Sequence, residues 1–287
     1  MTTATATPTL RLRAVRGRRR APMLAALRTL AVRRAALTAH NPRQIAVPML
    51  TPILFALVIA PALKMALGGL HSQIDYTAFV AVGTVGLLVP LATTFAGLSV
   101  IVDRDSGAQR ELLAAPVPRS LLLLGNLLVV VGLCSLQVVV VIAAAALRGA
   151  NFHISVGGLG WFAASSLLFV VLSYAVAETL AARIRTAEEY IGATPAIAIL
   201  PWFFAGALFP ISVLPGALTW VARFLPLTHA MALLRYGFVD PKGGGLHDIW
   251  GLASTTASAW LSFAVVVATT CALGALALRA FKRSVAA

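Results

Sequence analysis

Acidic residues are scarce in this chain. Only nine of the 287 residues are Asp or Glu, against 23 Lys and Arg, so the formal net charge is +14. Of the nine carboxylates, only Glu178 falls well inside a long apolar run. Proton-coupled pumps place acidic side chains within the membrane, so this scarcity argues against a proton relay.

The motifs that carry chemistry in many enzymes are also missing. The sequence has no Gly-x-x-x-x-Gly-Lys-Ser/Thr loop, so we expect the chain to bind no cofactor and not to hydrolyse ATP by itself. Its five histidines are scattered, without a His-Glu-x-x-His motif or a cysteine cluster, which gives a metal site little support. The two cysteines, Cys134 and Cys271, each lie in an apolar run, where a thiol behaves as a small hydrophobic group.

What the sequence does have is apolar length. Apolar residues make up 60% of the chain and the mean hydropathy is +0.91, unlike a soluble domain. A membrane-spanning helix needs about 20 apolar residues. The six stretches that qualify are residues 45–63, 77–102, 121–147, 159–182, 191–209 and 252–278. The sequence therefore predicts an all-α membrane protein whose six-span transmembrane domain covers residues 43–283.

The distribution of Lys and Arg predicts how these spans are oriented. Short cytoplasmic loops retain positively charged residues. Eighteen Lys and Arg lie on the side that holds both termini and the loop 103–119, whereas five lie on the opposite side. We therefore expect both termini, including the short tail 284–287, in the cytoplasm. Because the charges are spread over the ends of spans, they indicate contact with anionic lipid rather than nucleic acid.

The residues before the first span are expected to form a tail and a helix. Residues 1–21, rich in Thr, Ala and Arg, are predicted to be disordered. An interfacial helix is predicted within residues 22–42, because Pro22 suits a first helical position and Pro42 blocks continuation. Arg34 falls within the apolar face of this helix, so we expect its side chain to extend along that face to water. The alternative is a soluble basic tail.

A charged island, residues 103–119, separates the second and third predicted spans. Ser106 and Gln109 have the spacing of a capping pair, which satisfies free backbone donors at the start of a helix. A short helix is therefore predicted over residues 107–115. It should end there because Pro116 disfavours helical geometry at the residue before it.

This short helix has a small apolar face formed by Ala108, Leu112 and Ala115. A two-turn helix with so small an apolar face cannot bury itself, so we expect another protein to hold it in the cytosol. The alternative is a solvated turn between two spans. A solvated turn does not explain why the sequence starts and stops so short a helix.

A shorter cytosolic link, residues 183–189, joins the fourth and fifth predicted spans. Thr186 and Glu189 repeat the capping spacing and are expected to start the fifth span. Glu178 lies four residues before the end of the fourth span. Near this interface, pairing with Arg183 is favoured over a place on a transport path.

Residues 210–250, between the last two spans, hold apolar segments that are too short to cross a membrane. Pro210, Pro215 and Pro226 divide these segments. Non-helical backbone is tolerated at membrane depth where protein or water covers it, so we predict re-entrant or interfacial helices on the outer side. The alternative is an ordinary outer loop.

Taken in order, these features resemble the permease subunit of type 2 ATP-binding cassette exporters, in the daunorubicin-resistance and nodulation-factor branch. The resemblance covers nearly all of residues 22–283. Its specific sequences are Leu-Leu-Ala-Ala-Pro-Val-Pro-Arg at the end of the charged loop, Gly-Ala-Leu-Phe-Pro-Ile-Ser-Val-Leu-Pro at 206–215, and Pro-Leu-Thr-His-Ala-Met-Ala-Leu-Leu-Arg at 226–235. The family implies two copies of a separate ATPase that carries ATP and Mg, a second permease copy, and a bacterial cytoplasmic membrane.

The resemblance also implies roles for particular residues. In that family the second loop is a coupling helix, which docks in a cleft of the ATPase and transmits its closure. With the apolar face included, the docking residues are expected to be Asp103, Arg104, Asp105, Gly107, Ala108, Arg110, Glu111, Leu112, Ala115, Pro116 and Arg119. The re-entrant pair that caps the path implies outer gate residues, namely Phe209, Pro210, Leu214, Pro215 and Pro226. The loop departs from the family pattern by beginning Asp-Arg-Asp-Ser-Gly rather than with an acid followed by Arg-Glu-x-Gly.

The expected function is therefore export of a hydrophobic or amphipathic solute, such as a drug or a lipid-like or glycolipid-like molecule. A path without charged lining suits such cargo. The alternatives are a membrane-embedded lipid-modifying enzyme and a structural membrane anchor. An enzyme would need clustered polar residues at the interface, and those available are His40, Asp103, Asp105 and Glu111.

Overall fold

The computed structural model describes residues 23–59, 61–62, 65, 75–115 and 117–284, and every regular element within them is helical. The predicted disordered tail 1–21 and residues 285–287 lie outside this part of the chain. The first elements are α1 (Met23–Ala39), α2 (Pro42–Leu54), η1 (Phe55–Ile59), α4 (Tyr76–Asp105), α5 (Ala108–Ala114), α6 (Arg119–Leu147) and α7 (Val156–Ala181). They are followed by α8 (Ala187–Thr194), η2 (Pro195–Ile199), α9 (Leu200–Phe204), η3 (Ile211–Val213), α10 (Gly216–Phe224), α11 (Pro226–Phe238), α12 (Gly244–Trp250) and α13 (Thr255–Ser284).

Four of the described helices, α4, α6, α7 and α13, are long and apolar enough to cross a membrane. α10 and α11 together make a fifth candidate, but they meet at a bend of 83°. The fold is therefore an all-helical, multi-pass membrane protein. The count of six spans stays a prediction.

Two of the predicted spans, 45–63 and 191–209, are helical in pieces. The first begins as α2 and passes into the π-helical turn η1, after which residues 60 and 63 lie outside the described chain. The second consists of α8, η2 and α9, and the π-helical turn η2 begins at Pro195. Proline has no backbone N–H and its ring crowds the preceding turn, and a π-helical turn is one way a helix accommodates such a break. Neither segment therefore forms one continuous α-helix.

The long helices do not end where their apolar runs end. α4 continues to Asp105, three residues beyond the predicted end of its span at 102. It starts at Tyr76 because the Asp75 carboxylate accepts the backbone N–H of Thr77 (2.9 Å), which satisfies a free donor of the first turn. The first residues of the charged loop, 103–105, therefore belong to α4, and the helix determines where their side chains point.

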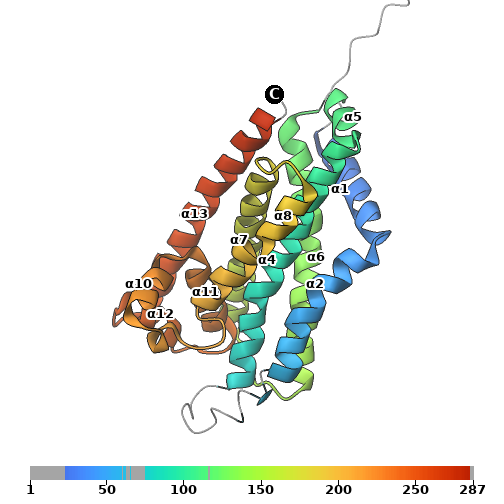
Figure 1. The fold of residues 1–287 in the computed structure, drawn as a ribbon. Coiled ribbons are helices and arrows are strands. Elements are labelled where there is room, and N and C mark those ends of the chain that lie inside the picture. The colour runs from blue at the N-terminus through green and yellow to red at the C-terminus, as the bar shows by residue number, and fades with distance from the viewer. Residues whose placement is uncertain (1–22, 60, 63–64, 66–74, 116, 285–287) are drawn as a thin grey trace, which may run out of the picture.

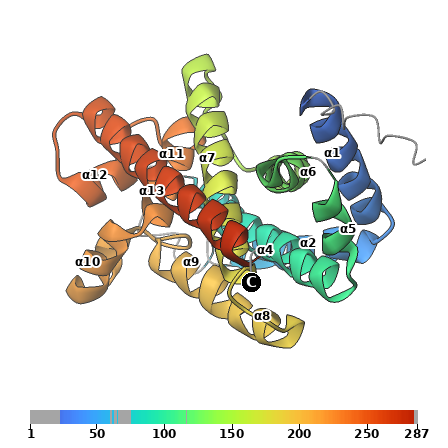
Figure 2. The same ribbon diagram turned by 90° about the horizontal axis from the view of Figure 1, so that it is seen from above.

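α4 lies at the centre of the bundle (Figure 1). α7, α6 and α2 pack against α4, while α11 and α13 pack against α7. α5 and the carboxyl-terminal end of α13 lie at one end of the bundle, and α10 and α12 lie in the other half. Figure 2 shows α1 beside α6 at one edge and α10 and α12 at the opposite edge.

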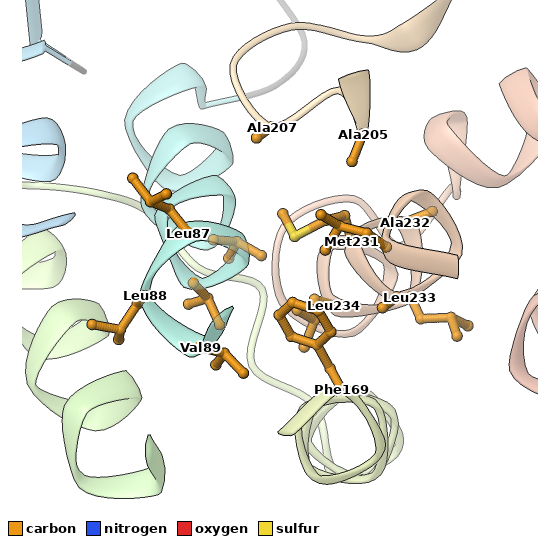
Figure 3. Close-up of a cluster of buried hydrophobic side chains, with 14 of the residues drawn as sticks. Leu87, Leu88, Val89, Phe169, Ala205, Ala207, Met231, Ala232, Leu233 and Leu234 are labelled. Carbon is orange, nitrogen blue, oxygen red and sulfur yellow. The ribbon is translucent and has the colours of Figure 1, made fainter. Parts of the chain in front are cut away.

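The largest buried apolar cluster forms where α4, α7 and α11 meet. Figure 3 shows Leu87 of α4, Phe169 of α7 and Met231 of α11 within it. α4 approaches its neighbours closely because it carries glycine at the contact. A Cβ atom at Gly83 would lie 2.1 Å from the carbonyl oxygen of Ala207, so a larger residue there would force the two segments apart.

Candidate functional site

α5 is the short helix predicted for the charged loop, but it begins differently from the prediction. Ser106 ends α4 as its C-cap, and Gly107 then turns the chain with a φ of 79°. The Ser106 hydroxyl donates to the carbonyl oxygen of Asp103 (3.3 Å), and in the described chain no side chain caps α5. The predicted Ser106–Gln109 capping pair is therefore wrong. Because α4 overruns its apolar segment, Ser106 serves the end of α4, and a glycine makes the turn.

The two faces of α5 have different surroundings. Leu112 is half-buried and lines a small cavity of about 30 Å³ together with Leu30 of α1 and Leu122 of α6. The exposed residues of α5 and its C-cap are Arg110, Glu111, Ala114 and Ala115, and Ala108 is half-exposed. The exposed surface of α5 thus includes Arg110 and Glu111, while Leu112 lines the cavity between α5, α1 and α6.

Arg34 of α1 is buried, with only 7% of its surface exposed. Its Nη1 lies 3.2 Å from Oδ2 of Asp103, and its Nη2 donates to the hydroxyl of Ser99 on α4. The prediction that Arg34 extends to water is therefore wrong. α1 packs against α6, and this packing places Arg34 next to the end of α4. A charged side chain that is buried requires a partner.

Arg104 ties the end of α4 to the link between α7 and α8. Its guanidinium donates to the carbonyl oxygens of Ala181 (3.3 Å), Ile184 (3.0 Å) and Arg185 (2.8 Å). The Ala181 carbonyl is a free acceptor at the end of α7, and those of Ile184 and Arg185 lie in the link to α8. A cation satisfies such carbonyls well. The predicted cap of α8 is confirmed, since the Thr186 hydroxyl accepts the backbone N–H of Glu189 (3.2 Å).

The predicted docking residues thus separate into two groups. Asp103 and Arg104 are engaged in contacts within the chain. Asp105 and Arg119 are exposed on either side of α5, and Gly107 is half-exposed at its turn. Pro116 lies outside the described residues.

Glu178 lies inside the bundle rather than at its surface. It is only 3% exposed, whereas Arg183 is exposed. Oε1 of Glu178 is buried and has no hydrogen-bond partner within the described residues. The expected pairing with Arg183 is therefore wrong, because α7 buries Glu178 within the bundle while Arg183 is exposed in the link after α7.

The predicted gate residues mark the starts of new helical elements. Pro210 precedes η3, Pro215 precedes α10, and Pro226 is the first residue of α11. Pro210 lines a cavity of about 160 Å³ with Arg235, whereas Pro226 lines a separate cavity of about 320 Å³. The structure therefore does not gather them into one site. The half-buried members are Phe209, Pro210, Leu214 and Pro226, and Pro215 is exposed.

Sequence reasoning counted Arg235 only as a charge on the outer side, but the structure buries it. Its guanidinium donates to the carbonyl oxygens of Gly206 (2.8 Å) and Ala207 (2.6 Å), and its Cζ lies 3.4 Å from the centre of the Phe79 ring. Arg235 thereby holds the turn after α9 against α4. The signal was present in the sequence, because Arg235 closes the motif at 226–235.

A chain of hydrogen bonds joins the four helices of the carboxyl-terminal half. The Trp250 indole N–H donates to the Ser262 hydroxyl oxygen (2.8 Å), which lies 3.2 Å from Nδ1 of His229. Nε2 of His229 lies 2.9 Å from the carbonyl oxygen of Arg223. Since a carbonyl can only accept, Nε2 carries the proton and Nδ1 accepts from Ser262. This network links α10, α11, α12 and α13 and gives buried His229 a structural role.

The described residues form no cluster of metal ligands and no disulfide. Within the described residues, no group of three or more His, Cys, Asp or Glu is placed to hold a metal ion. Cys134 is buried and Cys271 is exposed, and both are free thiols. The described contacts thus bind helices to one another and leave α5 projecting from one end.

Comparison with known proteins gives consistent matches. The family model described as "ABC-2 type transporter" matches residues 25–239. Nodulation protein J of Rhizobium leguminosarum bv. trifolii is 28% identical over 192 residues, which cover 64% of this chain and 70% of that protein. Nodulation protein J of Rhizobium meliloti (strain 1021) is 26% identical over the same shares of both chains. The counterpart in Sinorhizobium fredii (strain NBRC 101917 / NGR234) is 26% identical over 196 residues, 64% of this chain and 71% of that protein.

Proposed function

Because the chain belongs to the ABC-2 type transporter family, we propose that it is the permease subunit of an exporter driven by a separate ATP-hydrolysing protein. Two copies of that protein, which carries ATP and Mg, bind a pair of permease chains in a bacterial cytoplasmic membrane. Both termini and α5 face the cytoplasm, as the Lys and Arg distribution favours.

The observation that carries this proposal is the placement of α5. None of its residues is buried, yet its base is fixed by two arginines. Arg34 joins Asp103 to α1, and Arg104 joins the end of α4 to the α7–α8 link. When a bound protein moves a helix that projects from a rigid base, the helices packed against that base move with it, since packed helices shift as units.

The docking surface that we propose is centred on Arg110 and Glu111. Asp105 and Arg119 flank these residues, and Ala108 and Ala115 complete the surface. Gly107 provides the turn, and Leu112 supports α5 from the inner side. Asp103 and Arg104 hold the base of α5 through contacts within the chain and do not contact the ATPase.

The solute is proposed to be hydrophobic or amphipathic, as a drug, lipid-like or glycolipid-like molecule would be. The cavity of about 320 Å³ beside Pro90 and Pro226 has an almost entirely apolar lining, which favours such cargo. On the outer side, Trp220 of α10 is 64% exposed and packs against Phe224, with ring centres 4.6 Å apart and ring planes inclined at 54°. Exposed aromatic pairs suit the headgroup boundary, so α10 is proposed to lie at the outer membrane surface near the gate.

Reversing the charges on α5 tests the docking surface. Arg110→Glu with Glu111→Lys is expected to weaken association with the co-expressed ATPase by about tenfold or more, because like charges then meet in the interface. The amount of ATPase that co-purifies with the permease measures this. Arg148→Glu is the matched control, since Arg148 is also exposed but lies at the other end of α6.

Two results would contradict the proposal in different ways. A wild-type chain that binds no ATPase would remove the transport function. A charge-reversed chain that binds as well as the Arg148 variant would leave the function in place and move the docking surface away from α5.

A further inference from the structure

A cavity of about 160 Å³ lies between α11, α12 and the turn after α9, in the half of the bundle away from α5 (Figure 1). Exposed residues form its mouth, namely Ser212, Gly244 and Gly245, and buried residues form its floor, namely Thr228 and Arg235. One buried water molecule needs roughly 10–15 Å³ of such space. The cavity is therefore large enough for a ligand group.

Two polar atoms at the floor of the cavity are left over by the fold. Thr228 is 2% exposed and Arg235 is 8% exposed. The Thr228 hydroxyl and Nε of Arg235 have no hydrogen-bond partner among the residues that the structure describes. The two terminal nitrogens of Arg235 donate to the carbonyl oxygens of Gly206 and Ala207, which leaves its Nε–H as a donor for a ligand. Buried polar groups without a partner are costly, so a ligand that fills the cavity can satisfy both.

Two carboxylates supply acceptors nearer the mouth. Asp240 and Asp248 both line the cavity and are half-buried. Asp240 accepts the backbone N–H groups of Lys242 (3.1 Å) and Gly244 (2.6 Å), and Asp248 accepts the hydroxyl of Ser212 (3.0 Å). These bonds hold the carboxylates in place, and each carboxylate oxygen can accept a further donor. The cavity thus offers donors at its floor and acceptors at its mouth.

The charges and donors of the cavity select the kind of ligand. A guanidinium binds a phosphate or carboxylate best through two parallel N–H groups, whereas Arg235 has one N–H left to offer. An anionic group would also meet the carboxylates of Asp240 and Asp248, and a cationic group would meet the guanidinium. A hydroxyl both donates and accepts, so an uncharged group with several hydroxyls fits this set. Phe79 and Ala232 give the cavity an apolar wall, against which the carbon skeleton of such a group can pack.

We propose that this cavity binds an uncharged, hydroxyl-rich headgroup, namely a sugar. Nε–H of Arg235 donates to one ligand oxygen, the Thr228 hydroxyl bonds a second, and Asp240 and Asp248 accept from ligand hydroxyls. Two sources carry this chemistry, a free sugar in solution and the sugar headgroup of an amphipathic molecule in the membrane. The site goes beyond the proposed function, because binding requires neither the ATPase nor ATP.

A titration with a simple sugar tests the site. Methyl glucoside is added to the purified chain in phosphatidylcholine nanodiscs, whose lipid headgroup has no hydroxyl to compete, and saturation-transfer NMR measures binding. Methyl glucuronide and methyl glucosaminide carry a carboxylate and an ammonium group on the same ring. Each should bind about fivefold or more weakly than methyl glucoside, because one unfavourable charge enters the cavity. Octyl glucoside distinguishes the sources, since a membrane headgroup predicts tighter binding than methyl glucoside and a free sugar predicts equal binding.

Thr228→Val removes the ligand-binding hydroxyl and keeps the shape of the side chain. The chain itself should remain as stable, because this hydroxyl bonds no other described residue. Binding of methyl glucoside should weaken about fivefold through the loss of one hydrogen bond. Ser165→Ala is the matched control, since Ser165 also has a buried hydroxyl without a partner in the described chain but lies on α7, away from this cavity. It should bind as the wild type does.

Gly245→Leu fills the mouth of the cavity. A Cβ atom at Gly245 would lie 3.7 Å from Cβ of Ala232, an ordinary contact, so the new side chain enters the cavity without displacing backbone. Binding should weaken by about tenfold or more, because the leucine occupies the space of the ligand. Gly160→Leu is the matched control, since Gly160 is exposed in α7 and a Cβ atom there would meet nothing within 4 Å.

Three results would overturn the site. These are no saturable binding of methyl glucoside to the wild type, which would mean that water fills the cavity, binding that Thr228→Val and Gly245→Leu leave unchanged, and tighter binding of either charged analogue. Failure of the proposed function gives a different result, because a chain that binds no ATPase would still bind the sugar in this titration.

Discussion

Single residues decide how closely α4 approaches the turn after α9. The Ala207 carbonyl oxygen lies over Gly83 and also accepts a hydrogen bond from Arg235 (2.6 Å). The Trp202 indole N–H donates to the carbonyl oxygen of Gly83 (2.8 Å). A side chain at position 83 would therefore separate groups that two hydrogen bonds hold together.

Gly83→Ala is expected to destabilise the protein by about 1–3 kcal/mol, because the new methyl group would meet rigid backbone rather than a flexible side chain. Gly132→Ala is the matched control, since a Cβ atom there would meet nothing within 4 Å. The control should be neutral or slightly stabilising, as alanine favours a helix interior. Thermal unfolding in detergent compares the two, and equal melting temperatures would show that the contact at Gly83 is not tight.

At the scale of elements, the carboxyl-terminal half depends on polar contacts between short helices. α10 has nine residues, α11 thirteen and α12 seven, lengths at which helices are marginal by themselves. The chain from Trp250 through Ser262 and His229 to the Arg223 carbonyl oxygen ties them to α13. The bend between α10 and α11 therefore depends on α13 as well as on Pro226.

Ser262→Ala should loosen this half of the molecule. It leaves Nδ1 of buried His229 and the indole N–H of half-buried Trp250 without this partner, at a cost of about 1–3 kcal/mol. Hydrogen exchange should become faster in α10 and α12 while α4 and α6 keep their protection. Thr256→Ala, at an exposed position of the same helix, should change neither region. Protection that is the same in both variants would show that the network does not hold these helices.

At the scale of the whole molecule, the sidedness of the chain decides whether α5 can meet a cytoplasmic ATPase. The four continuous apolar helices and the bent α10–α11 pair do not by themselves fix the number of crossings. The number of crossings depends on the two helical segments that are interrupted at η1 and η2. The prediction of six spans requires both segments to cross the membrane.

Thiol labelling tests this topology. In a chain whose two cysteines are replaced by Ala, Ser106→Cys should react with a membrane-impermeant reagent only after the cells are opened. Lys242→Cys should react in intact cells, because the charge distribution places it on the outer side. Both positions are exposed. Labelling of both from the same side would require a different number of spans between α5 and α12.

The sequence predicted most of the elements and few of the contacts. Apolar run length gave α4, α6 and α7 to within three residues and α13 to within six, because hydrocarbon thickness dictates that length. The capping pair at Ser106 failed, since local spacing does not reveal that α4 continues past its apolar run. The sequence placed three buried charged residues near water, namely Arg34, Glu178 and Arg235. A single charged residue in an apolar segment does not reveal from the sequence which distant residue it contacts.

By itself, the sequence determined that this chain is a helical membrane protein with a short charged helix between two spans. Composition and run length suffice for this, because the bilayer imposes the same requirement on every chain. The tertiary structure alone decided that Arg34 pairs with Asp103, and that Arg235 holds the turn after α9. These contacts join residues far apart along the chain, and their energies depend on burial that arises only when the helices pack.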